Sequence, residues 1–149
     1  MYNIKEDNKI KVAATTLIEA KPSEVWAVLA DIENWQKWTP FIASFEGDFE
    51  LNGKIKVTFN TPDGLVPFDR SLVIFEENRV FCWEGDAPFP NSKDHHVFYL
   101  EEDENGNTLL TQADGFHGME RTEDVTNMEE QSKGLYAMMN EQLKAFIEG

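Results

Sequence analysis

The sequence predicts an α+β fold in which a curved antiparallel sheet of about seven strands wraps around one long C-terminal helix. The first observation is a stretch from about Thr122 to Ile147, where apolar residues recur with helical spacing. The second is a series of alternating segments upstream, separated by turn sequences, which indicates consecutive hairpins. The third is a pair of short helical segments after the first strand. Because such a sheet has one apolar face, the terminal helix is expected to cover it.

The C-terminal helix is defined by one apolar stripe, while charged residues occupy its opposite side as on a solvated face. The upper half of the stripe contains flexible or small side chains, and methionines fill irregular gaps easily. Such a surface suits a helix above a cavity as well as one that closes a packed core. The stripe consists of Val125, Met128, Leu135, Met139, Leu143 and Phe146, and its upper half contains Met128, Ser132, Leu135, Met138 and Met139.

The N-terminal part of the chain predicts one strand followed by two short helices. Lys9 to Glu19 alternates between apolar and polar residues, as a half-buried strand does. Pro22 suits the first turn of a helix. Asp31 is the expected N-cap of a second short helix that ends before Pro40. The first helix is expected to bury Val25, Trp26, Val28 and Leu29, and Trp35 and Trp38 are expected to anchor the short helices rather than to stack on a ligand.

The next segment predicts a hairpin about Leu51-Asn52-Gly53, where glycine supplies the positive φ of a tight turn. Glu50 would then pair with Lys54. The hairpin is followed by Asn60 to Pro67, where two prolines and one glycine predict a loop. In this register the inner face of the sheet carries Phe45, Gly47, Phe49, Ile55, Val57 and Phe59.

Two further hairpins complete the predicted sheet. Glu77-Asn78 predicts a tight turn between the fourth and fifth strands, and Asp103 to Asn107 predicts a polar turn between the sixth and seventh. Ala87 to Lys93 again contains two prolines and predicts a second loop at the same end of the sheet as the first. The four strands are expected at Asp69 to Glu76, Arg79 to Gly85, about Asp94 to Glu102 and Thr108 to Phe116, with Leu72, Ile74, Phe81 and Trp83 on one face.

The register of the last two strands brings a histidine to a carboxylate. With the polar turn at its centre, the hairpin places His96 opposite Asp114. The same register places Phe98 opposite Gln112. Because Phe98 marks the apolar inner face, His96, Gln112 and Asp114 are expected to point inward.

This pair allows two interpretations. His96 and Asp114 are candidate catalytic residues, because an imidazole beside a carboxylate can serve as a general acid and base. They are alternatively a buried hydrogen-bonded pair that satisfies its own polar groups. The sequence shows no nucleophile or oxyanion donor beside them, which favours the second interpretation. In both cases the carboxylate is expected to raise the pKa of His96 unless desolvation outweighs it.

The aromatic inner face and the flexible helix stripe favour a ligand cavity over a closed core. The expected cavity lies between Met128–Met139 and the inner face, with a volume of roughly 300–1,000 Å³, and opens near the two predicted loops. The candidate ligand-binding residues are Phe59, Arg70 (near the rim), Leu72, Phe81, Trp83, Phe98, Gln112, Met128, Ser132, Leu135 and Met139.

Composition limits the class of protein. The 149 residues are expected to form one domain over 1–149, and a formal net charge of −15 disfavours nucleic acid and anionic membranes as partners. The single cysteine, Cys82, agrees with a reducing compartment. No segment approaches the roughly 20 apolar residues of a membrane span, and the first residues do not resemble a signal peptide. A cytoplasmic protein without membrane insertion is therefore expected, either a monomer or a homodimer.

No metal site and no cofactor are predicted. His95 and His96 are adjacent in a strand, so their side chains point to opposite faces of the sheet. No further histidine or cysteine stands at the spacing of a metal ligand set.

A resemblance to known proteins rests on Ile18–Trp26, the pair Trp35 and Trp38, His96–Leu100, Thr108–Gly118 and Gly134–Lys144. In this order and spacing, these segments resemble the SRPBCC superfamily, which contains the START, Bet v 1-like and polyketide cyclase/dehydrase-like proteins. The resemblance covers nearly the whole chain and implies the helix-grip fold. Members of the superfamily bind lipids, sterols, polyketides and other hydrophobic ligands, and only some are enzymes, so the resemblance implies a fold more specifically than a function.

Three functions are consistent with these observations. The leading hypothesis is binding of a hydrophobic small molecule (lipid-, polyketide- or aromatic-like) between the sheet and the C-terminal helix. The second is an enzyme of polyketide cyclase/dehydratase type that uses His96 and Asp114 as acid and base. The third is a protein-interaction module of activator-of-Hsp90-like type. That third function would expose an apolar patch on the outer sheet face, built from Val73, Phe75, Val80 and Cys82.

Overall fold

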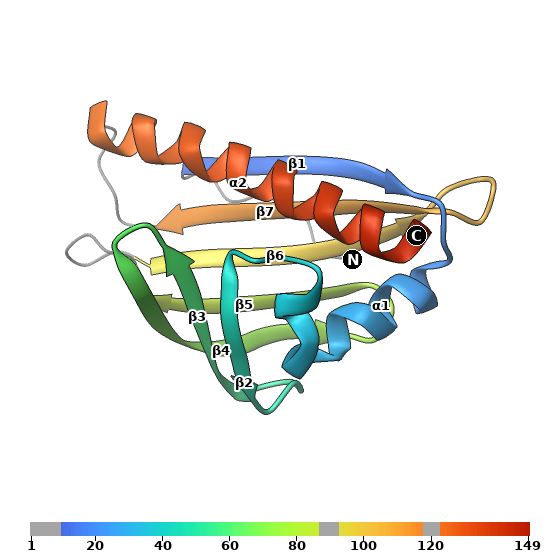
Figure 1. Cartoon of the computed structure of the whole chain (residues 1–149), viewed down its shortest axis with the longest axis horizontal. Helices are drawn as coiled ribbons and strands as arrows, with labels where there is room; N and C mark the ends of the chain where they lie inside the picture. Colours follow the sequence, from blue (N-terminus) through green and yellow to red (C-terminus); the bar gives the residue numbers. More distant parts are fainter. Residues whose placement is uncertain (1–9, 87–92, 118–122) are drawn as a thin grey trace.

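The computed structural model describes residues 10–86, 93–117 and 123–149. The described residues form seven strands, two α-helices and one 3-10 helix, which Figure 1 shows. Their order is β1 (Ile10–Ile18), α1 (Pro22–Ala30), η1 (Ile32–Lys37), β2 (Ile42–Gly47), β3 (Lys54–Thr61), β4 (Gly64–Glu76), β5 (Val80–Asp86), β6 (Lys93–Glu102), β7 (Thr108–His117) and α2 (Glu123–Glu148). The predicted fold class is therefore confirmed.

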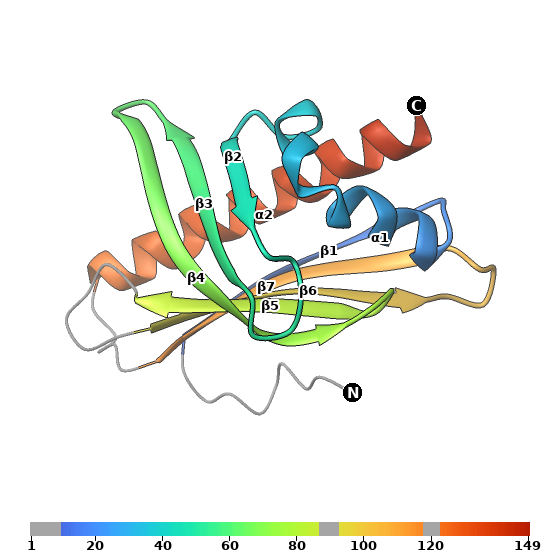
Figure 2. The same cartoon turned by 90° about the horizontal axis from the view of Figure 1, so that it is seen from below.

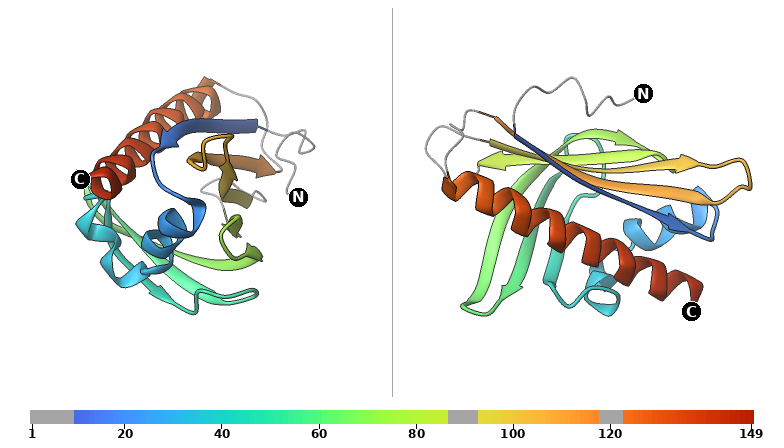
Figure 3. Two further views of the ribbon diagram at one scale, coloured as in Figure 1. Left: turned by 90° about the vertical axis from the view of Figure 1, so that its right-hand side faces the viewer. Right: turned by 90° about the horizontal axis from the view of Figure 1, so that it is seen from above.

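The seven strands form one antiparallel sheet in the order β1-β7-β6-β5-β4-β3-β2. The sheet is strongly curved: β2 and β3 rise steeply away from the plane of β5, β6 and β7, and the long strand β4 bends between the two halves (Figure 2). The helices α1 and α2 lie on the concave side (Figure 3, left). The sheet thus wraps around its helical cover, as the twist of β-sheets favours.

The two short helices are anchored by tryptophans. Trp35 is fully buried, its indole nitrogen donates to the Leu29 carbonyl at 2.8 Å, and its ring packs against Trp38, Phe45 and Phe98 at centroid distances of 4.9, 4.8 and 5.5 Å. The predicted anchoring role is confirmed, because an indole N–H that is hydrogen-bonded inside a core fixes the ring in place.

Asp31 stands at the predicted N-cap of η1, but its carboxylate makes no capping bond to the helix backbone. Its Oδ2 atom instead accepts from the side-chain amide of Asn34 at 2.8 Å, while the Asp31 carbonyl accepts from the Asn34 N–H at 3.1 Å. The N-cap position of Asp31 was predicted correctly, but its carboxylate accepts from the Asn34 side chain rather than from the helix backbone.

The first hairpin is longer at its turn than predicted. Gly47 pairs with Ile55, so β2 ends three residues before Glu50. The positive φ belongs to Asn52, at 66°, and not to Gly53. Gly53 is required for another reason, since a Cβ atom there would lie 1.9 Å from the Asp48 carbonyl oxygen. The predicted inner face survives because a register change of two residues preserves side-chain direction.

The predicted loop at Asn60 to Pro67 is wrong, because these residues continue β3 and begin β4. Only Pro62 and Asp63 lie between the two strands. Pro67 is accommodated because this part of β4 pairs with β3 alone, whereas pairing with β5 begins at Ser71. Proline is tolerated where one side of a strand has no neighbour.

A bulge in β4 overturns one predicted side-chain direction. Leu72 pairs with Trp83 as predicted, but the register shifts before Ile74, which pairs with Cys82. Ile74 therefore lies on the outer face and Phe75 on the inner face, where its ring contacts Trp26 at a centroid distance of 5.5 Å. One extra residue in a strand reverses the direction of every following side chain, and the sequence alone does not mark it.

The outer face of the sheet does not carry the apolar patch that a protein-interaction module would expose. Val80 and Cys82 are fully buried in a cluster on that face, and Phe75 points inward. Of the four residues of the patch, Val73 alone is substantially exposed, at 38%. A single exposed valine is ordinary for a protein surface.

The last hairpin follows the prediction closely. β6 pairs with β7 so that His96 lies opposite Asp114 and Phe98 opposite Gln112. The carboxylate of Asp103 accepts from two backbone N–H groups of the turn, at 2.9 and 2.8 Å, which holds the register. Of the second predicted loop, residues 87–92 lie outside the described residues, and Lys93 begins β6.

The predicted apolar stripe of α2 is confirmed at the centre of the helix, but the prediction is wrong at the C-terminal end. Met139 and Leu143 are buried, whereas Phe146 is 48% exposed and Met138 is 52% exposed. Ile147 continues the stripe instead, because it lies one helical turn after Leu143. Met128 and Leu135 are partly buried, and the side chain of Val125 lies outside the described residues. The predicted stripe also omitted two buried residues, Tyr136 and Asn140.

Candidate functional site

A pocket of about 380 Å³ lies between the β3–β4 hairpin, the first half of α2 and the inner face of β5, β6 and β7. Its volume falls within the predicted range and near the lower limit of small-molecule sites. The lining residues are Val57, Phe59, Thr61, Val66, Phe68, Arg70, Trp83, Asp94, His96, Asp114, Met128, Ser132, Leu135 and Tyr136.

Eight of the thirteen predicted site residues line this pocket: Phe59, Arg70, Trp83, His96, Asp114, Met128, Ser132 and Leu135. The other five, Leu72, Phe81, Phe98, Gln112 and Met139, are almost completely buried in the protein interior and do not line it. Phe81 and Phe98 stack on each other at a centroid distance of 4.7 Å and fill the sheet interior beside Trp35. The cavity therefore occupies only the end of the sheet where α2 begins.

Six lining residues were not among the predicted site residues: Val57, Thr61, Val66, Phe68, Asp94 and Tyr136. Val66 and Phe68 were missed because their segment was assigned to a loop or a loop end. Tyr136 carried a usable signal, since it lies one helical turn after Ser132. The β3–β4 hairpin end agrees with one half of the predicted entrance, and the other half falls on residues 87–92, outside the described residues.

The inner end of the pocket is polar, and Asp114 is at its centre. The Asp114 Oδ2 atom accepts from the Tyr136 hydroxyl at 2.7 Å and lies 3.4 Å from His96 Nδ1. The Asp114 Oδ1 atom accepts from the His95 backbone N–H at 3.1 Å. Both carboxyl oxygens are thus engaged by groups of the protein itself.

A chain of hydrogen bonds determines which nitrogen of His96 carries a proton. The Ala14 carbonyl can only accept, so the Asn140 amide nitrogen donates to it at 3.0 Å. The Asn140 oxygen then accepts from the Gln112 amide nitrogen at 3.1 Å, which leaves the Gln112 oxygen as the acceptor that faces His96 Nε2 at 2.7 Å. Nε2 of His96 is therefore protonated, and Nδ1 faces Asp114.

His96 and Asp114 are both buried, and their facing atoms, Nδ1 and Oδ2, are 3.4 Å apart. Burial lowers the pKa of His96 to about 3. Burial, followed by the charge of Asp94, raises the pKa of Asp114 well above its usual range. Burial therefore disfavours the charged form of both groups. The predicted pairing is correct, but the predicted direction of the His96 pKa is wrong, since desolvation outweighs the carboxylate.

Aromatic rings hold the His96 side chain in place. Its ring is stacked on Phe98 with an interplanar angle of 10° and a centroid distance of 5.1 Å. Trp83 and Tyr136 contact it at centroid distances of 4.7 and 4.5 Å. An imidazole surrounded in this way has little access to water, which accounts for its low pKa.

A second polar pair, Arg70 and Asp94, spans three strands. Gly85 on β5 lies directly opposite Asp94 on β6, and Arg70 on β4 passes over this glycine. The Arg70 Nε and Asp94 Oδ1 atoms are 3.1 Å apart. The Arg70 Nη1 atom donates to the Asp69 carbonyl at 2.9 Å, and the guanidinium lies 4.8 Å from the centre of the Phe68 ring. The missing side chain of Gly85 makes this arrangement possible.

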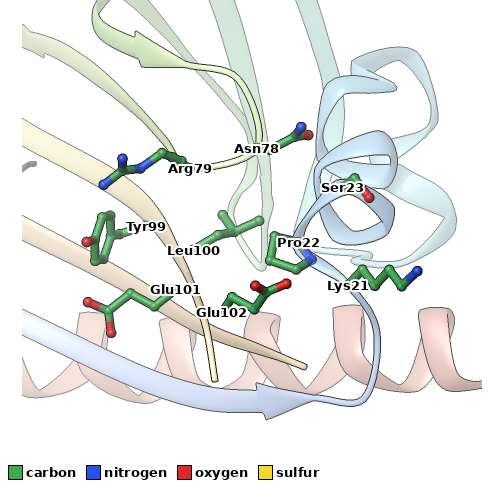
Figure 4. Close-up of a pocket in the computed structure, with 9 residues that line it drawn as sticks. All are labelled: Lys21, Pro22, Ser23, Asn78, Arg79, Tyr99, Leu100, Glu101 and Glu102. Atoms are coloured by element: carbon green, nitrogen blue, oxygen red, sulfur yellow. The ribbon is translucent and has the colours of Figure 1, made fainter. Parts of the chain in front are cut away.

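A larger surface hollow of about 580 Å³ lies at the opposite end of the molecule, where α1 begins (Figure 4). Four of its nine lining residues are charged, and two of these, Lys21 and Arg79, lie on different sides of it (Figure 4). The smaller pocket remains the candidate site, because its lining is more strongly apolar and includes the buried polar side chains of His96 and Asp114.

Among the described residues, no three histidine, cysteine, aspartate or glutamate side chains converge in a way that could hold a metal ion. Within the same part of the chain, no helix combines the length and the apolar character needed to span a membrane.

The sequence model of one family, described as polyketide cyclase/dehydrase and lipid transport, matches residues 9–148. The chain belongs to this family. The resemblance to the SRPBCC superfamily is thereby confirmed. Comparison with curated protein sequences gives no match.

Solved structures support the same fold for this member of the polyketide cyclase/dehydrase and lipid transport family. A START superfamily protein from Mycobacterium smegmatis is 13% identical with a TM-score of 0.71, over 93% of this chain and 97% of that one. Ara h 8.0201 is 15% identical with a TM-score of 0.67, over 92% and 96%. The di-domain ARO/CYC protein StfQ of the steffimycin biosynthetic pathway is 14% identical with a TM-score of 0.73, over 93% of this chain and 50% of that one.

Family and fold together indicate a hydrophobic ligand-binding or polyketide cyclase-like role. They do not distinguish between the two, because the same fold carries both kinds of site.

Proposed function

We propose that this protein binds a hydrophobic small molecule in the pocket between the β3–β4 hairpin and α2. The observation that carries the proposal is a cavity of about 380 Å³ with apolar walls and one polar inner end. Ligand sites typically combine a mainly apolar lining with a few polar groups that orient the ligand. The apolar walls consist of Val57, Phe59, Val66, Phe68, Trp83, Met128 and Leu135.

Binding would come mainly from burial of apolar ligand surface, which contributes about 25 cal/mol per Å². The walls come from elements that are distant in sequence. Phe59 and Phe68 form an edge-to-face pair on the β3–β4 hairpin, with ring centroids 5.5 Å apart. Met128 and Leu135 face the pocket from α2. A flexible methionine at this position allows the wall to adapt to its ligand.

The direct test is native mass spectrometry of protein purified from its own host. We expect a retained apolar molecule in the wild-type protein and its loss in Leu135→Trp, where the larger side chain fills the pocket. Met138→Trp is the matched control, because Met138 lies on the same helix and is 52% exposed. Wild-type protein without a retained molecule, or equal retention in both variants, would contradict the proposal.

A second candidate function is proton transfer to or from a bound ligand by His96 and Asp114. The favouring observation is that both residues line the pocket, with His96 Nδ1 3.4 Å from Asp114 Oδ2. Against it, every nitrogen and carboxyl oxygen of the pair already has a partner within the protein: Gln112 at His96 Nε2, the His95 N–H at Asp114 Oδ1, and Tyr136 at Asp114 Oδ2. A ligand would have to displace one of these, so we place binding first.

A further inference from the structure

Resting on the proposed function, we propose that the indole N–H of Trp83 donates a hydrogen bond to the bound ligand. The pocket then selects apolar molecules that carry an acceptor oxygen, such as a ketone or ester carbonyl, over hydrocarbons of the same shape. Trp83 belongs to β5 and lines the pocket. Its ring is part of the apolar wall, and its nitrogen is the one polar atom of its side chain.

Trp83 is set apart from the other polar side chains of the pocket lining by its lack of a partner. Its N–H makes no hydrogen bond within the described part of the chain. An indole N–H can only donate, so the group that it lacks is an acceptor. The other polar lining side chains are already paired: Thr61 with the Gly64 carbonyl, Arg70 with Asp94, His96 with Gln112, Tyr136 with Asp114, and Ser132 with Tyr136.

The Trp83 N–H is also within reach of a ligand. Some buried side-chain atoms of the described residues have neither a hydrogen-bond partner nor appreciable accessible surface. Trp83 Nε1 has no partner either, but it is not one of these enclosed atoms and so keeps accessible surface. Because Trp83 is only 2% exposed and lines the pocket, this surface opens into the pocket. The enclosed atoms are Trp38 Nε1, Thr39 Oγ1, Arg70 Nε, Asp94 Oδ1 and Gln142 Oε1.

Packing fixes the direction of this donor before a ligand arrives. The Trp83 ring contacts those of His96, Phe98 and Phe45 at centroid distances of 4.7, 5.5 and 5.8 Å. A donor that is already held in place loses little conformational freedom on binding. A buried donor without a partner is satisfied when a ligand supplies the acceptor, so Trp83 determines where the ligand oxygen lies.

The test compares two probes of nearly the same shape, 2-acetylnaphthalene and 2-isopropenylnaphthalene, in which a carbonyl oxygen is replaced by a CH₂ group. Isothermal titration calorimetry measures the affinity of both for the wild-type protein and for Trp83→Phe, which keeps an aromatic ring and removes the N–H. In Trp83→Phe, the affinity for the ketone should fall at least about threefold relative to that for the alkene, as expected for one lost hydrogen bond.

The matched control is Trp38→Phe. Trp38 Nε1 is also without a partner among the described residues, but it is enclosed in the core and Trp38 does not line the pocket. This variant removes the same group from the protein and should keep the wild-type ratio of the two affinities.

Nitrogen-15 spectra of the wild-type protein give a second measurement. The indole N–H signal of Trp83 should move downfield when the ketone binds and not when the alkene binds. The signal of Trp35 should stay in place with both probes, because its N–H already donates to the Leu29 carbonyl.

An affinity ratio that is the same in the wild-type protein and in Trp83→Phe would overturn the inference alone. Failure of both probes to bind the wild-type protein would overturn the proposed function together with it. If Trp83→Phe does not fold, the wild-type spectra decide, and a Trp83 signal that responds equally to ketone and alkene overturns the inference.

Discussion

Arg70 occupies the space that a side chain at Gly85 would fill. A Cβ atom on Gly85 would lie 2.5 Å from Arg70 Cδ and 2.6 Å from Nη1. Because Gly85 is opposite Asp94 in the β5–β6 register, this gap is the path along which Arg70 crosses one strand to reach a carboxylate on the next. The polar end of the pocket thus depends on a residue that has no functional group.

The first prediction concerns this glycine. Gly85→Ala should lower the free energy of unfolding by about 1–3 kcal/mol, because the added methyl group overpacks a filled site and displaces Arg70. Urea denaturation measures the change. Gly134→Ala is the control: its Cβ would meet open space in α2, and alanine should stabilise that helix by about 0.5–1 kcal/mol. Stabilisation by both substitutions would show that Arg70 does not occupy the gap.

The second prediction compares two neighbouring methionines of α2. Met139 is 1% exposed and Met138 is 52% exposed. Met139→Asp should cost about 3–5 kcal/mol of unfolding free energy, since it removes core packing and buries a carboxylate. Met138→Asp should stay within about 0.5 kcal/mol of the wild-type value. Thermal or urea unfolding of both variants would test the orientation of the helix, and similar losses in both would contradict it.

The third prediction concerns pH. The pKa of His96 is about 3 in the folded protein and about 6.5 in an unfolded chain, so folding holds the residue neutral where the unfolded chain binds a proton. His96 therefore contributes stability that is fully present above pH 6.5 and is lost as the pH falls towards 3. Asp114 acts with the opposite sign, because its raised pKa favours the folded state at low pH.

Comparison with His96→Gln measures the pH dependence that requires the histidine, because glutamine does not titrate. Between pH 7 and pH 5, the unfolding free energy of the wild-type protein should fall by about 2 kcal/mol relative to this variant. Denaturation curves at both pH values provide the measurement. A difference between the two proteins that does not change with pH would mean that His96 ionises normally in the fold.

The fourth prediction tests the series of hydrogen bonds that runs from the Ala14 carbonyl through Asn140 and Gln112 to His96. Gln112→Leu and Asn140→Leu should each destabilise the protein by about 1–3 kcal/mol, because each leaves a buried polar partner unsatisfied. The double variant should lose less unfolding free energy than the two single variants lose together, with a coupling energy of about 0.5–3 kcal/mol. Strict additivity would mean that the two amides act independently. Nitrogen-15 spectra of the wild-type imidazole should show the proton on Nε2.

The sequence by itself determined the order of the elements, the antiparallel pairing and the register of the last hairpin. His96 could be placed opposite Asp114 because strand alternation and one short turn are local, and the Asp103 carboxylate holds that turn through bonds to its own backbone. Local rules also identified the buried centre of α2, where helical spacing continues from Met139 to Leu143.

The tertiary structure alone decided which inner residues face a cavity. Phe98 and Trp83 are both on the apolar inner face, yet Trp83 lines the pocket and Phe98 packs against other rings. A pocket is the space that distant elements leave between them, so it depends on how they interdigitate rather than on alternation along a strand. The pKa of His96 follows the same logic: its partner could be predicted from the register, but the desolvation that outweighs this partner comes from rings contributed by β5, β6 and α2.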